Sequence, residues 1–316
     1  METQPLVSVI IPNYNHSGYL LERINSVMEQ NFKNFEVILM DDLSTDGSKN
    51  ILLSYQGKPK ISHIVINTEN SGSTFKQWKK GLQLAKGKYI WIAESDDSAS
   101  PIFLDKLVAI LESNEAISVA FCKSNIIDEN NNVLSLENTQ ATIDSSLGKE
   151  NYIIDGRELL DRAFRHLNII PNASAVVFRK DAIDPVVFER IKKMRYAGDW
   201  LFWVSLIQDF KVAFVSEYLN NFRFHSQSTR GGKSVEDDTK RMEECLSIID
   251  EISGKNKFNR ANVKMSWLHK DWILRVINRD KDYKELIRTP FDKNLRYYII
   301  VIELILKHNI RKLIKK

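Results

Sequence analysis

Blocks of apolar and polar residues alternate along the first 111 residues and predict strands and helices in turn. Residues 7–11 form a run rich in β-branched side chains that stops at Pro12, which is typical of a buried parallel strand. Three further apolar runs of strand length follow, at residues 35–40, 61–66 and 89–93. Apolar residues at helical spacing fill the other segments, at residues 20–28, 48–55, 75–85 and 101–111. This alternation predicts right-handed βαβ units and a mostly parallel, Rossmann-like sheet with helices on both faces.

The carboxyl ends of three predicted strands carry polar residues. They are, in chain order, Pro12-Asn13-Tyr14, Asp41-Asp42 and Asp96-Asp97. In open sheets of this kind, ligands bind beyond the carboxyl ends of the strands. The three strand ends therefore predict one shared ligand site.

The rest of the chain is less regular. Residues 125–150 are polar and rich in asparagine, and they predict an irregular excursion or a hairpin that turns at residues 129–132. Helices are expected at residues 155–166 and 199–208, and strands at 175–179, 212–216 and 221–224. A polar linker over residues 226–238 is followed by helical periodicity alone. We therefore expect an α/β domain, residues 1–235, and a C-terminal helical, basic extension, residues 236–316.

The net charge of +4 is too small to indicate a nucleic-acid partner, but it is unevenly distributed. Residues 257–316 contain 16 Lys and Arg against 6 Asp and Glu, whereas the preceding residues contain 29 against 35. The two cysteines, Cys122 and Cys245, argue against a disulfide framework and favour a reducing, cytoplasmic location. We find no signal-peptide pattern and no apolar stretch of the ~20 residues that span a bilayer.

The end of the chain has two interpretations. Apolar residues 297–306 are followed by five basic residues, Lys307, Arg311, Lys312, Lys315 and Lys316. Such a basic amphipathic helix can lie on the anionic inner face of the cell membrane as a peripheral contact. It can equally pack on the preceding domain with its lysines in solvent.

The pair Asp96-Asp97 is a candidate metal site. Carboxylate oxygens are the ligands that Mg²⁺ and Mn²⁺ prefer, and such ions bridge to substrate phosphates. A departing diphosphate needs its charge neutralised. The alternative is that Asp97 only caps the helix that opens at Ser100-Pro101. A second acidic pair in the same sheet favours the metal site.

That second pair, Asp41-Asp42, suits recognition of a nucleotide base. A carboxylate there can accept a hydrogen bond from a base N–H, while Tyr14 on the neighbouring strand end can stack on the ring. The alternative is turn chemistry, because Asp, Ser and Gly dominate turns for local reasons. Turn chemistry explains Asp46-Gly47 well and two adjacent carboxylates less well.

Longer motifs add a family resemblance. They are Val-Ser-Val-Ile-Ile-Pro-Asn-Tyr-Asn (7–15), Ser-Val-Met-Glu-Gln-Asn-Phe (26–32), Phe-Glu-Val-Ile-Leu-Met-Asp-Asp-Leu-Ser-Thr-Asp-Gly-Ser (35–48), Asn70-Ser71-Gly72 and Ala85-Lys86-Gly87-Lys88-Tyr89-Ile90. In order and spacing they resemble the opening of family 2 glycosyltransferases, over residues 6–230. The resemblance implies a GT-A fold and a metal-dependent, inverting sugar transfer, most often from a UDP-sugar.

The resemblance also implies roles for single residues. Pro12 and Tyr14 would line the base pocket, and Asp42 would hold the uracil edge with support from Asp41. Asp97 would bind Mn²⁺ or Mg²⁺. The remaining positions of the nucleotide-sugar site would be Asn15, Asn70, Gly72, Glu94 and Asp96.

The acidic cluster departs from the family pattern at one position. Glu94 stands where many relatives have the first aspartate, and Ser95 separates it from Asp96. Asp96 is expected to face the ribose or the donor sugar. Either Glu94 or Asp96 is therefore a candidate for the carboxylate that assists Asp97.

An inverting transfer needs a general base on the acceptor side. Asp199, in Tyr196-Ala197-Gly198-Asp199-Trp200, resembles the catalytic acidic position of the family. The alternative is an N-cap aspartate at the start of an amphipathic helix. We favour the base.

Two further segments are candidates. Arg223 and His225 alternate in Asn-Phe-Arg-Phe-His-Ser (221–226), which is similar to a segment after the catalytic helix in relatives. Their side chains would grip the diphosphate or complete the metal site. Asn172-Ala173-Ser174 precedes a predicted strand and is expected to line the acceptor cleft.

These observations predict a glycosyltransferase that builds a surface polysaccharide or similar glycan, with a glycan or a lipid-linked glycan as acceptor. One alternative is a nucleotidyltransferase on a similar sheet, which would need a glycine-rich, basic phosphate loop after the first strand. Pro12-Asn13-Tyr14-Asn15 does not supply that loop. The other is an inactive module that only binds nucleotide-sugars, against which Asp97 and Asp199 argue.

Overall fold

The structure, a computed structural model, describes residues 4–136, 139–225, 234–253, 272–274, 276–277 and 301–307. The chain divides into two compact units. The first comprises residues 1–193 and 198–226, and the second comprises residues 194–197 and 227–316. The predicted boundary between residues 235 and 236 remains a prediction, and each unit is described by itself.

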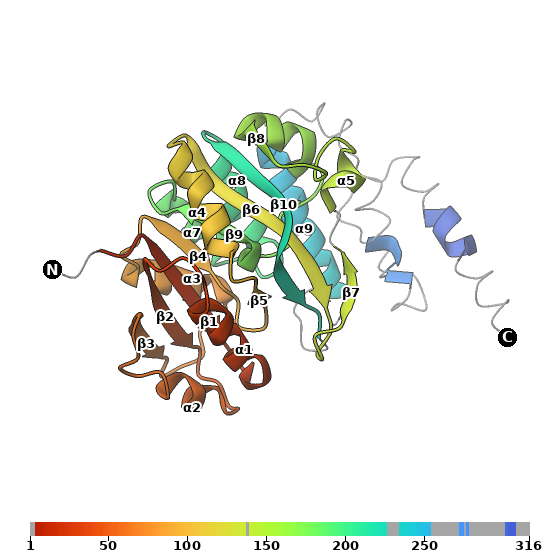
Figure 1. Cartoon of the computed structure of the whole chain (residues 1–316). Coiled ribbons are helices and arrows are strands. Elements are labelled where there is room, and N and C mark those ends of the chain that lie inside the picture. The colour runs from red at the N-terminus through yellow and green to blue at the C-terminus, as the bar shows by residue number, and fades with distance from the viewer. Residues whose placement is uncertain are drawn as a thin grey trace. The chain divides into compact units, whose positions relative to one another are not determined.

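The first unit begins with the predicted alternation of strands and helices (Figure 1). The strands pair in the order β3-β2-β1-β4, and all three pairings are parallel. The elements are β1 (Val7–Asn13), α1 (Ser17–Met28), β2 (Phe35–Asp41), α2 (Ser48–Leu53), β3 (Ile61–Ile66), α3 (Thr74–Leu84) and β4 (Tyr89–Ile92). The predicted ranges for these elements agree with the structure to within a few residues.

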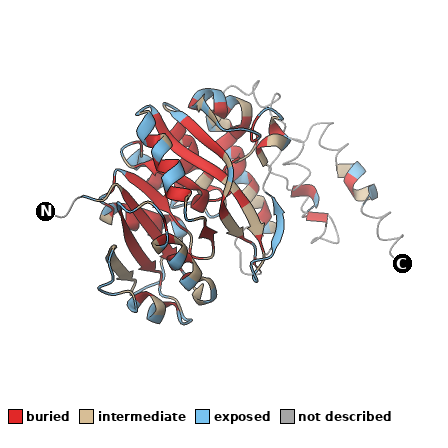
Figure 2. Ribbon diagram, in the orientation of Figure 1, coloured by how far each residue is buried: buried red, intermediate tan, exposed pale blue. Residues whose placement is uncertain are grey.

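Both faces of the sheet are covered, which explains why β1 is apolar along nearly its whole length. Val7, Val9 and Ile11 belong to a buried cluster with residues of α1 and α4 (Phe103–Ser113). Ile10 faces the other side, where Gly81 of α3 lies so close that an added Cβ would come within 2.5 Å of the Ile10 side chain. Figure 2 shows β1 and β2 as buried and β3, at the edge of the sheet, as mostly of intermediate burial.

The second half of the sheet is mixed. Its order continues β4-β9-β6-β10-β5, where β9 runs antiparallel to both neighbours and β10 is parallel to β6. The strands are β5 (Ser98–Ala99), β6 (Ile117–Ile127), β9 (Val176–Arg179) and β10 (Lys211–Arg223). Six of the eight strands along this path run in the same direction, so the sheet is mostly parallel, as predicted.

Several elements differ from the predictions. The two strands expected at 212–216 and 221–224 are one strand, β10, whose pairing with β6 is shifted between Val215 and Asn220. The expected helix at 155–166 is broken into β8 (Tyr152–Asp155), α6 (Gly156–Leu159) and a π-helical turn, η1 (Leu160–Phe164). Strand β6 and helix α7 (Pro185–Ile191) were not predicted. Residues 125–136 form the hairpin alternative, in which β7 (Val133–Leu136) pairs with β6.

Both N-cap alternatives are wrong. Helix α4 begins at Phe103 with Ile102 at its N-cap position, whereas Asp97 lies before β5. Ser100 and Pro101 therefore precede the helix. Helix α8 (Gly198–Ile207) includes Asp199 in its first turn, so that residue is not the cap.

The second unit contains α9 (Val235–Ile252), which begins within the polar linker predicted over residues 226–238 because Ser234 caps it. Glu244 of this helix accepts hydrogen bonds from the main-chain N–H groups of residues 195–197. Residues 301–307 are helical, and the rest of the predicted basic amphipathic helix lies outside the described residues. Within the described residues, no helix combines the length and apolar character that crossing a membrane requires.

Candidate functional site

The sequence predicted a ligand site at the sheet edge formed by the carboxyl ends of three strands, here called the ligand edge. These strands, β1, β2 and β4, are parallel, so their carboxyl ends do lie at one edge. Asn13 ends β1 and pairs in register with Asp41, which ends β2. Strand β4 also runs parallel to β1 and leads into Glu94-Ser95-Asp96-Asp97. The loops after these three strands therefore leave the same edge of the sheet.

Asp41 fastens two of these loops together. Its carboxylate accepts hydrogen bonds from Asn13 Nδ2 at 2.9 Å and from the main-chain and side-chain groups of Ser44 at 2.9 and 2.6 Å. Asn15 adopts a left-handed conformation, with φ of 55°, and its side-chain oxygen accepts from Thr45 N at 2.8 Å. Asp41 and Asn15 thus hold the shape of the edge.

Asp42 points into a different set of donors. Its Oδ1 accepts hydrogen bonds from Asn67 Nδ2 at 2.6 Å, Ser71 N at 2.8 Å and Gln77 Nε2 at 2.8 Å. Its Oδ2 accepts one, from Ser71 Oγ at 2.8 Å. Asp42 is 5 % exposed, and the four donors around its carboxylate give that group one fixed orientation.

The other predicted base-site residues differ in exposure. The side chain of Tyr14 is 48 % exposed and can offer a ring face, whereas Pro12 is buried within β1. Asn70 bonds to the main chain on both sides, donating to Asp42 O and accepting from Gly72 N. Gly72 has φ of +66°, a conformation that favours glycine, so these two residues shape the loop before α3.

Glu94 is a partly buried member of the acidic turn, residues 94–97. Its Oε1 accepts a hydrogen bond from Trp78 Nε1 at 2.9 Å, and its main-chain N–H donates to Ser174 Oγ. Burial raises the pKa of Glu94 to about 8, and the charge of Asp96 acts in the same direction. Trp78, which is 2 % exposed, packs against Phe202 and Trp203 of α8 and so connects that helix to the acidic turn.

Asp97 lies in the interior, contrary to the expectation that it faces the ligand. It is 1 % exposed, and its carboxylate accepts hydrogen bonds from Asn172 Nδ2 and from the main-chain N–H of Arg223. Arg23 Nη2 lies 3.9 Å from its Oδ2. Burial, together with the charge of Asp96, raises the pKa of Asp97 to about 6. The Asp97 carboxylate is therefore engaged by buried protein groups. Asn172, which was expected to line the acceptor cleft, is buried and contacts this carboxylate instead.

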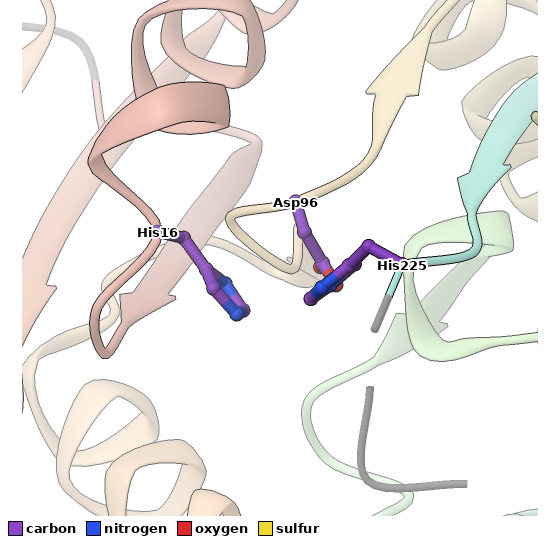
Figure 3. A group of neighbouring side chains, drawn as sticks. All are labelled: His16, Asp96 and His225. Atoms are coloured by element: carbon purple, nitrogen blue, oxygen red, sulfur yellow. The ribbon is translucent and has the colours of Figure 1, made fainter. Parts of the chain in front are cut away.

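Asp96, by contrast, meets two histidines (Figure 3). His225 Nε2 lies 3.0 Å from Asp96 Oδ2, and ligand atoms of His16, Asp96 and His225 all lie within 4.8 Å of one another. Burial opposes ionisation of Asp96, but the hydrogen bond from His225 and the nearby imidazoles outweigh it, so its pKa lies below the ordinary value. Burial lowers the pKa of His16. A carboxylate and two imidazoles are a metal-ligand set.

Arg223 does not have the geometry expected for gripping a diphosphate. It is 1 % exposed, and its guanidinium donates to the main-chain oxygens of Asp96 and Asp128 and pairs with Glu22 at 2.8 Å. The guanidinium carbon also lies 4.9 Å from the centre of the Tyr19 ring. These contacts hold the acidic turn against the end of β10, and they direct the Arg223 guanidinium to protein groups rather than to a diphosphate.

Asp199 lies in the first turn of α8, as expected for a residue placed by a helix start. Asn168 Nδ2 donates to its Oδ2 at 3.2 Å. Asn172, four residues further along the same segment, donates to Asp97, and four residues span at most about 14 Å. Gly198 lets α8 approach closely, since an added Cβ would lie 2.5 Å from the Phe75 ring. The segment from Asn168 to Asn172 therefore contacts both Asp199 and the acidic turn, through one hydrogen bond at each end.

Three residues of this region were missed in the sequence. His16 lies three residues beyond β1, at the predicted ligand edge, and that position was the available signal. Gln77 gave no signal, because it lies beyond the motif Asn70-Ser71-Gly72. Arg23 is fully buried on α1, and its Nε donates to Glu94 O at 2.8 Å. Helical spacing alone could not distinguish this buried cation from a surface arginine.

The fold and the site together define the protein class. A largely parallel sheet with helices on both faces is the GT-A fold, and here it presents two acidic loops and a carboxylate–imidazole group at one edge. The model of glycosyl transferase family 2 matches residues 8–184, and the chain belongs to this family. The family match decides between the predicted glycosyltransferase and the alternative nucleotidyltransferase.

Two relatives show how far the similarity extends. An uncharacterized glycosyltransferase of Methanocaldococcus jannaschii is 29 % identical over 224 residues, which cover 70 % of this chain and 71 % of the relative. The putative teichuronic acid biosynthesis glycosyltransferase TuaG of Bacillus subtilis is 39 % identical over 118 residues, which cover 37 % of this chain and 45 % of TuaG.

Two solved structures share the fold. TarS of S. aureus, residues 1–349 in complex with UDP, superposes with a TM-score of 0.60 at 19 % identity, and the match covers 90 % of this chain and 75 % of that TarS chain. The mannosyltransferase PcManGT from Pyrobaculum calidifontis, in complex with GDP-Man and Mn²⁺, has a TM-score of 0.56 at 14 % identity. It covers 100 % of this chain and 89 % of PcManGT.

Proposed function

We propose that this glycosyltransferase moves a sugar from a UDP-sugar to an acceptor hydroxyl with inversion, and that Asp96 and His225 hold a divalent cation, Mn²⁺ or Mg²⁺. The observation that carries the proposal is the 3.0 Å approach of Asp96 Oδ2 and His225 Nε2 at the ligand edge. These atoms come from segments 129 residues apart and are both metal-ligand types. The donor set therefore fits a divalent cation. When bound, the cation would offset charge on the departing diphosphate.

The surroundings of Asp42 support uracil as the base. A carboxylate offers about four acceptor positions, two on each oxygen. Three donors already crowd Oδ1, whereas within the described part of the chain Oδ2 accepts from Ser71 Oγ alone and keeps one position. Uracil presents one N–H on its pairing edge, and guanine presents two. One remaining acceptor therefore matches uracil, with Tyr14 as the stacking ring.

We assign the general base to Asp199. In a single displacement, the acceptor oxygen bonds to the anomeric carbon as the bond from that carbon to the diphosphate oxygen breaks. The acceptor proton would pass to the Asp199 carboxylate, which Asn168 orients. The short segment between Asn168 and Asn172 supports this role, because it connects the base to the acidic turn.

The acceptor we propose is a surface glycan or its lipid-linked precursor. This assignment follows from the relatives, one of which is named for teichuronic acid biosynthesis. An acceptor on a lipid would suit a protein at the inner face of the cell membrane. Co-sedimentation with anionic liposomes, with and without residues 290–316, tests the peripheral contact predicted for the basic C-terminus.

A thermal-shift comparison of UDP and GDP, each with and without Mn²⁺, tests the proposed donor. UDP with Mn²⁺ is expected to raise the melting temperature most, because ligand binding stabilises the folded state by mass action. Asp96→Asn should remove the Mn²⁺-dependent part of the shift and the hydrolysis of UDP-sugars. Asp209→Asn, at an exposed residue paired with Arg157, is the matched control and should behave as wild type. A larger shift with GDP than with UDP would overturn the base assignment.

A further inference from the structure

His16 enters the Asp96–His225 group from a third part of the chain. Asp96 follows β4, His225 follows β10, and His16 lies in the loop between β1 and α1. Figure 3 shows the two imidazoles and the carboxylate directed toward a common space. The His16 and His225 rings are 5.3 Å apart between centroids and nearly perpendicular, at 89°.

Ser95 fixes the orientation of His16. The His16 Nδ1 atom lies 2.8 Å from the hydroxyl oxygen of Ser95, which is 1 % exposed. When Nδ1–H donates to that oxygen, the lone pair of the ring is on Nε2, which is the tautomer that a metal ion needs. Metal-binding histidines nearly always have such a partner on their other nitrogen. Because Ser95 directly precedes Asp96, one turn orients both side chains.

The acidic turn supplies few oxygen ligands for the same space. The Glu94 carboxylate accepts from Trp78 Nε1, and the Asp97 carboxylate accepts from Asn172 and from the main-chain N–H of Arg223. Within the described residues, Asp96 is the only carboxylate that belongs to this group. Ions that prefer oxygen ligands alone therefore gain little from the protein here.

We infer that His16 is a third protein ligand, so that two imidazole nitrogens and one carboxylate oxygen select a first-row transition-metal ion over Mg²⁺. The inference rests on the proposed function, because it concerns the cation assigned there to Asp96 and His225. Two ligand atoms on opposite sides of an ion lie about 4.2 Å apart, so atoms within 4.8 Å need only small side-chain movements. Imidazole nitrogen favours ions such as Co²⁺ and Zn²⁺, whereas Mg²⁺ favours oxygen.

The test measures metal binding directly, on the full chain in the presence of UDP. Free Mn²⁺ is followed by electron paramagnetic resonance, and Co²⁺ and Mg²⁺ are titrated in competition with it. The wild-type protein is expected to bind Co²⁺ and Mn²⁺ at least tenfold more tightly than Mg²⁺. His16→Gln keeps a polar group near Ser95 but removes the imidazole. It should weaken Co²⁺ binding about tenfold or more, Mn²⁺ binding less, and Mg²⁺ binding least.

A second variant protects the test against a fold defect. His16 occupies the N-cap position of α1, where aspartate is favoured, so His16→Asp should fold normally. It replaces a nitrogen ligand by oxygen and should shift the preference toward Mg²⁺, a change that a packing role would not produce. His63→Gln, on β3, is the matched histidine control and should leave all three affinities unchanged.

The outcomes separate the two proposals. Absence of any Mn²⁺ binding by the wild-type protein with UDP would overturn the proposed function together with this inference. Wild-type Mn²⁺ binding that is unchanged in His16→Gln, with the same Co²⁺ to Mg²⁺ ratio in His16→Asp, would overturn the inference alone.

Discussion

The carboxylate of Asp97 accepts a hydrogen bond from the main-chain N–H of Arg223 at 2.9 Å, which fastens the acidic turn to the end of β10. Asp96 immediately precedes one partner, and His225 follows the other by two residues. This contact between residues 126 positions apart therefore helps to set the spacing of the two side chains that we assign to the cation. An interior role for Asp97 and a ligand role for Asp96 predict different mutant behaviour.

Asp97→Ala is expected to lower the free energy of unfolding by about 3 kcal/mol or more, because it removes the carboxylate paired with the buried Arg23 at 3.9 Å. It also removes the acceptor from the Asn172 amide. Asp96→Ala should change stability much less and abolish Mn²⁺ binding. Urea unfolding of the metal-free protein, followed by tryptophan fluorescence, measures the difference. An Asp97→Ala protein as stable as Asp96→Ala would contradict the interior role.

Gln77 is expected to control nucleotide affinity without touching the reacting atoms. Its amide donates to Asp42 Oδ1 and to Ser71 Oγ, so Gln77→Leu removes two contacts that orient the Asp42 carboxylate. Losing one such hydrogen bond costs about 1 kcal/mol, or roughly five- to tenfold in affinity. Isothermal titration with UDP should show this loss, while kcat at saturating donor stays close to wild type. Gln56→Leu, before the exposed Gly57 turn, is the control. Equal UDP affinities for the two variants would argue against the role of Gln77.

Asp144 should give the protein a pH-dependent part of its stability. Hydrogen bonds from Ser146 and the ion pair with Arg162 lower the pKa of Asp144 to about 2. A lowered pKa stabilises the fold above the unfolded-state value near ~4, and that stabilisation is lost as the pH falls toward 2. Asp144→Asn should therefore cost about 1 kcal/mol at pH 7, after allowance for solvent screening. The difference from wild type should shrink below pH 4.

Urea unfolding at pH 7, 5, 4 and 3 measures this trend. The comparison variant is Asp161→Asn. The Asp161 side chain is 70 % exposed, and its ion pair with Arg165 is long, at 3.6 Å, so this variant should be as stable as wild type at every pH. If the difference in the free energy of unfolding between wild type and Asp144→Asn were the same at all four pH values, the lowered pKa of Asp144 would not be the source of the stabilisation.

The parallel half of the fold was predictable because local pattern and tertiary structure agree there. Strands such as β1 are buried on both faces, so their sequence is almost wholly apolar and short loops delimit them. Strand β6 was missed although its first six residues are all buried, because Ser118, Lys123 and Ser124 interrupt its apolar run. In β10, Ser216 and Glu217 lie at a shift in register, which a pattern of fixed period divides into two strands.

The candidate site was predictable in outline and not in detail. Strand ends predicted that Asp42 and Asp96 follow neighbouring strands at one edge of the sheet, and the parallel pairing of β1 with β2 and β4 agrees with this. Asp199 was proposed from the family resemblance, and its role stays a prediction. The sequence could not tell which of Asp96 and Asp97 faces outward, because a turn of unknown geometry separates them from β4. It also could not reveal contacts between distant segments, such as that of His16 with Ser95, 79 residues away. For the same reason, Arg223 was expected to bind the diphosphate. In the structure its guanidinium pairs with Glu22 and donates hydrogen bonds to two main-chain oxygens.

Asp199→Asn is expected to separate chemistry from binding. The amide cannot take a proton from the acceptor, so kcat should fall by about 10²- to 10⁴-fold. UDP binding should stay unchanged, because the described contacts of Asp42 do not involve Asp199. Asn168→Ala should give a smaller loss of kcat, since it removes only the group that orients the base. Product formation from a UDP-sugar and an acceptor glycan, measured beside UDP titration, tests both variants. Undiminished turnover by Asp199→Asn would assign the base to another residue, and weaker UDP binding with normal kcat would give Asp199 a role in the donor site instead.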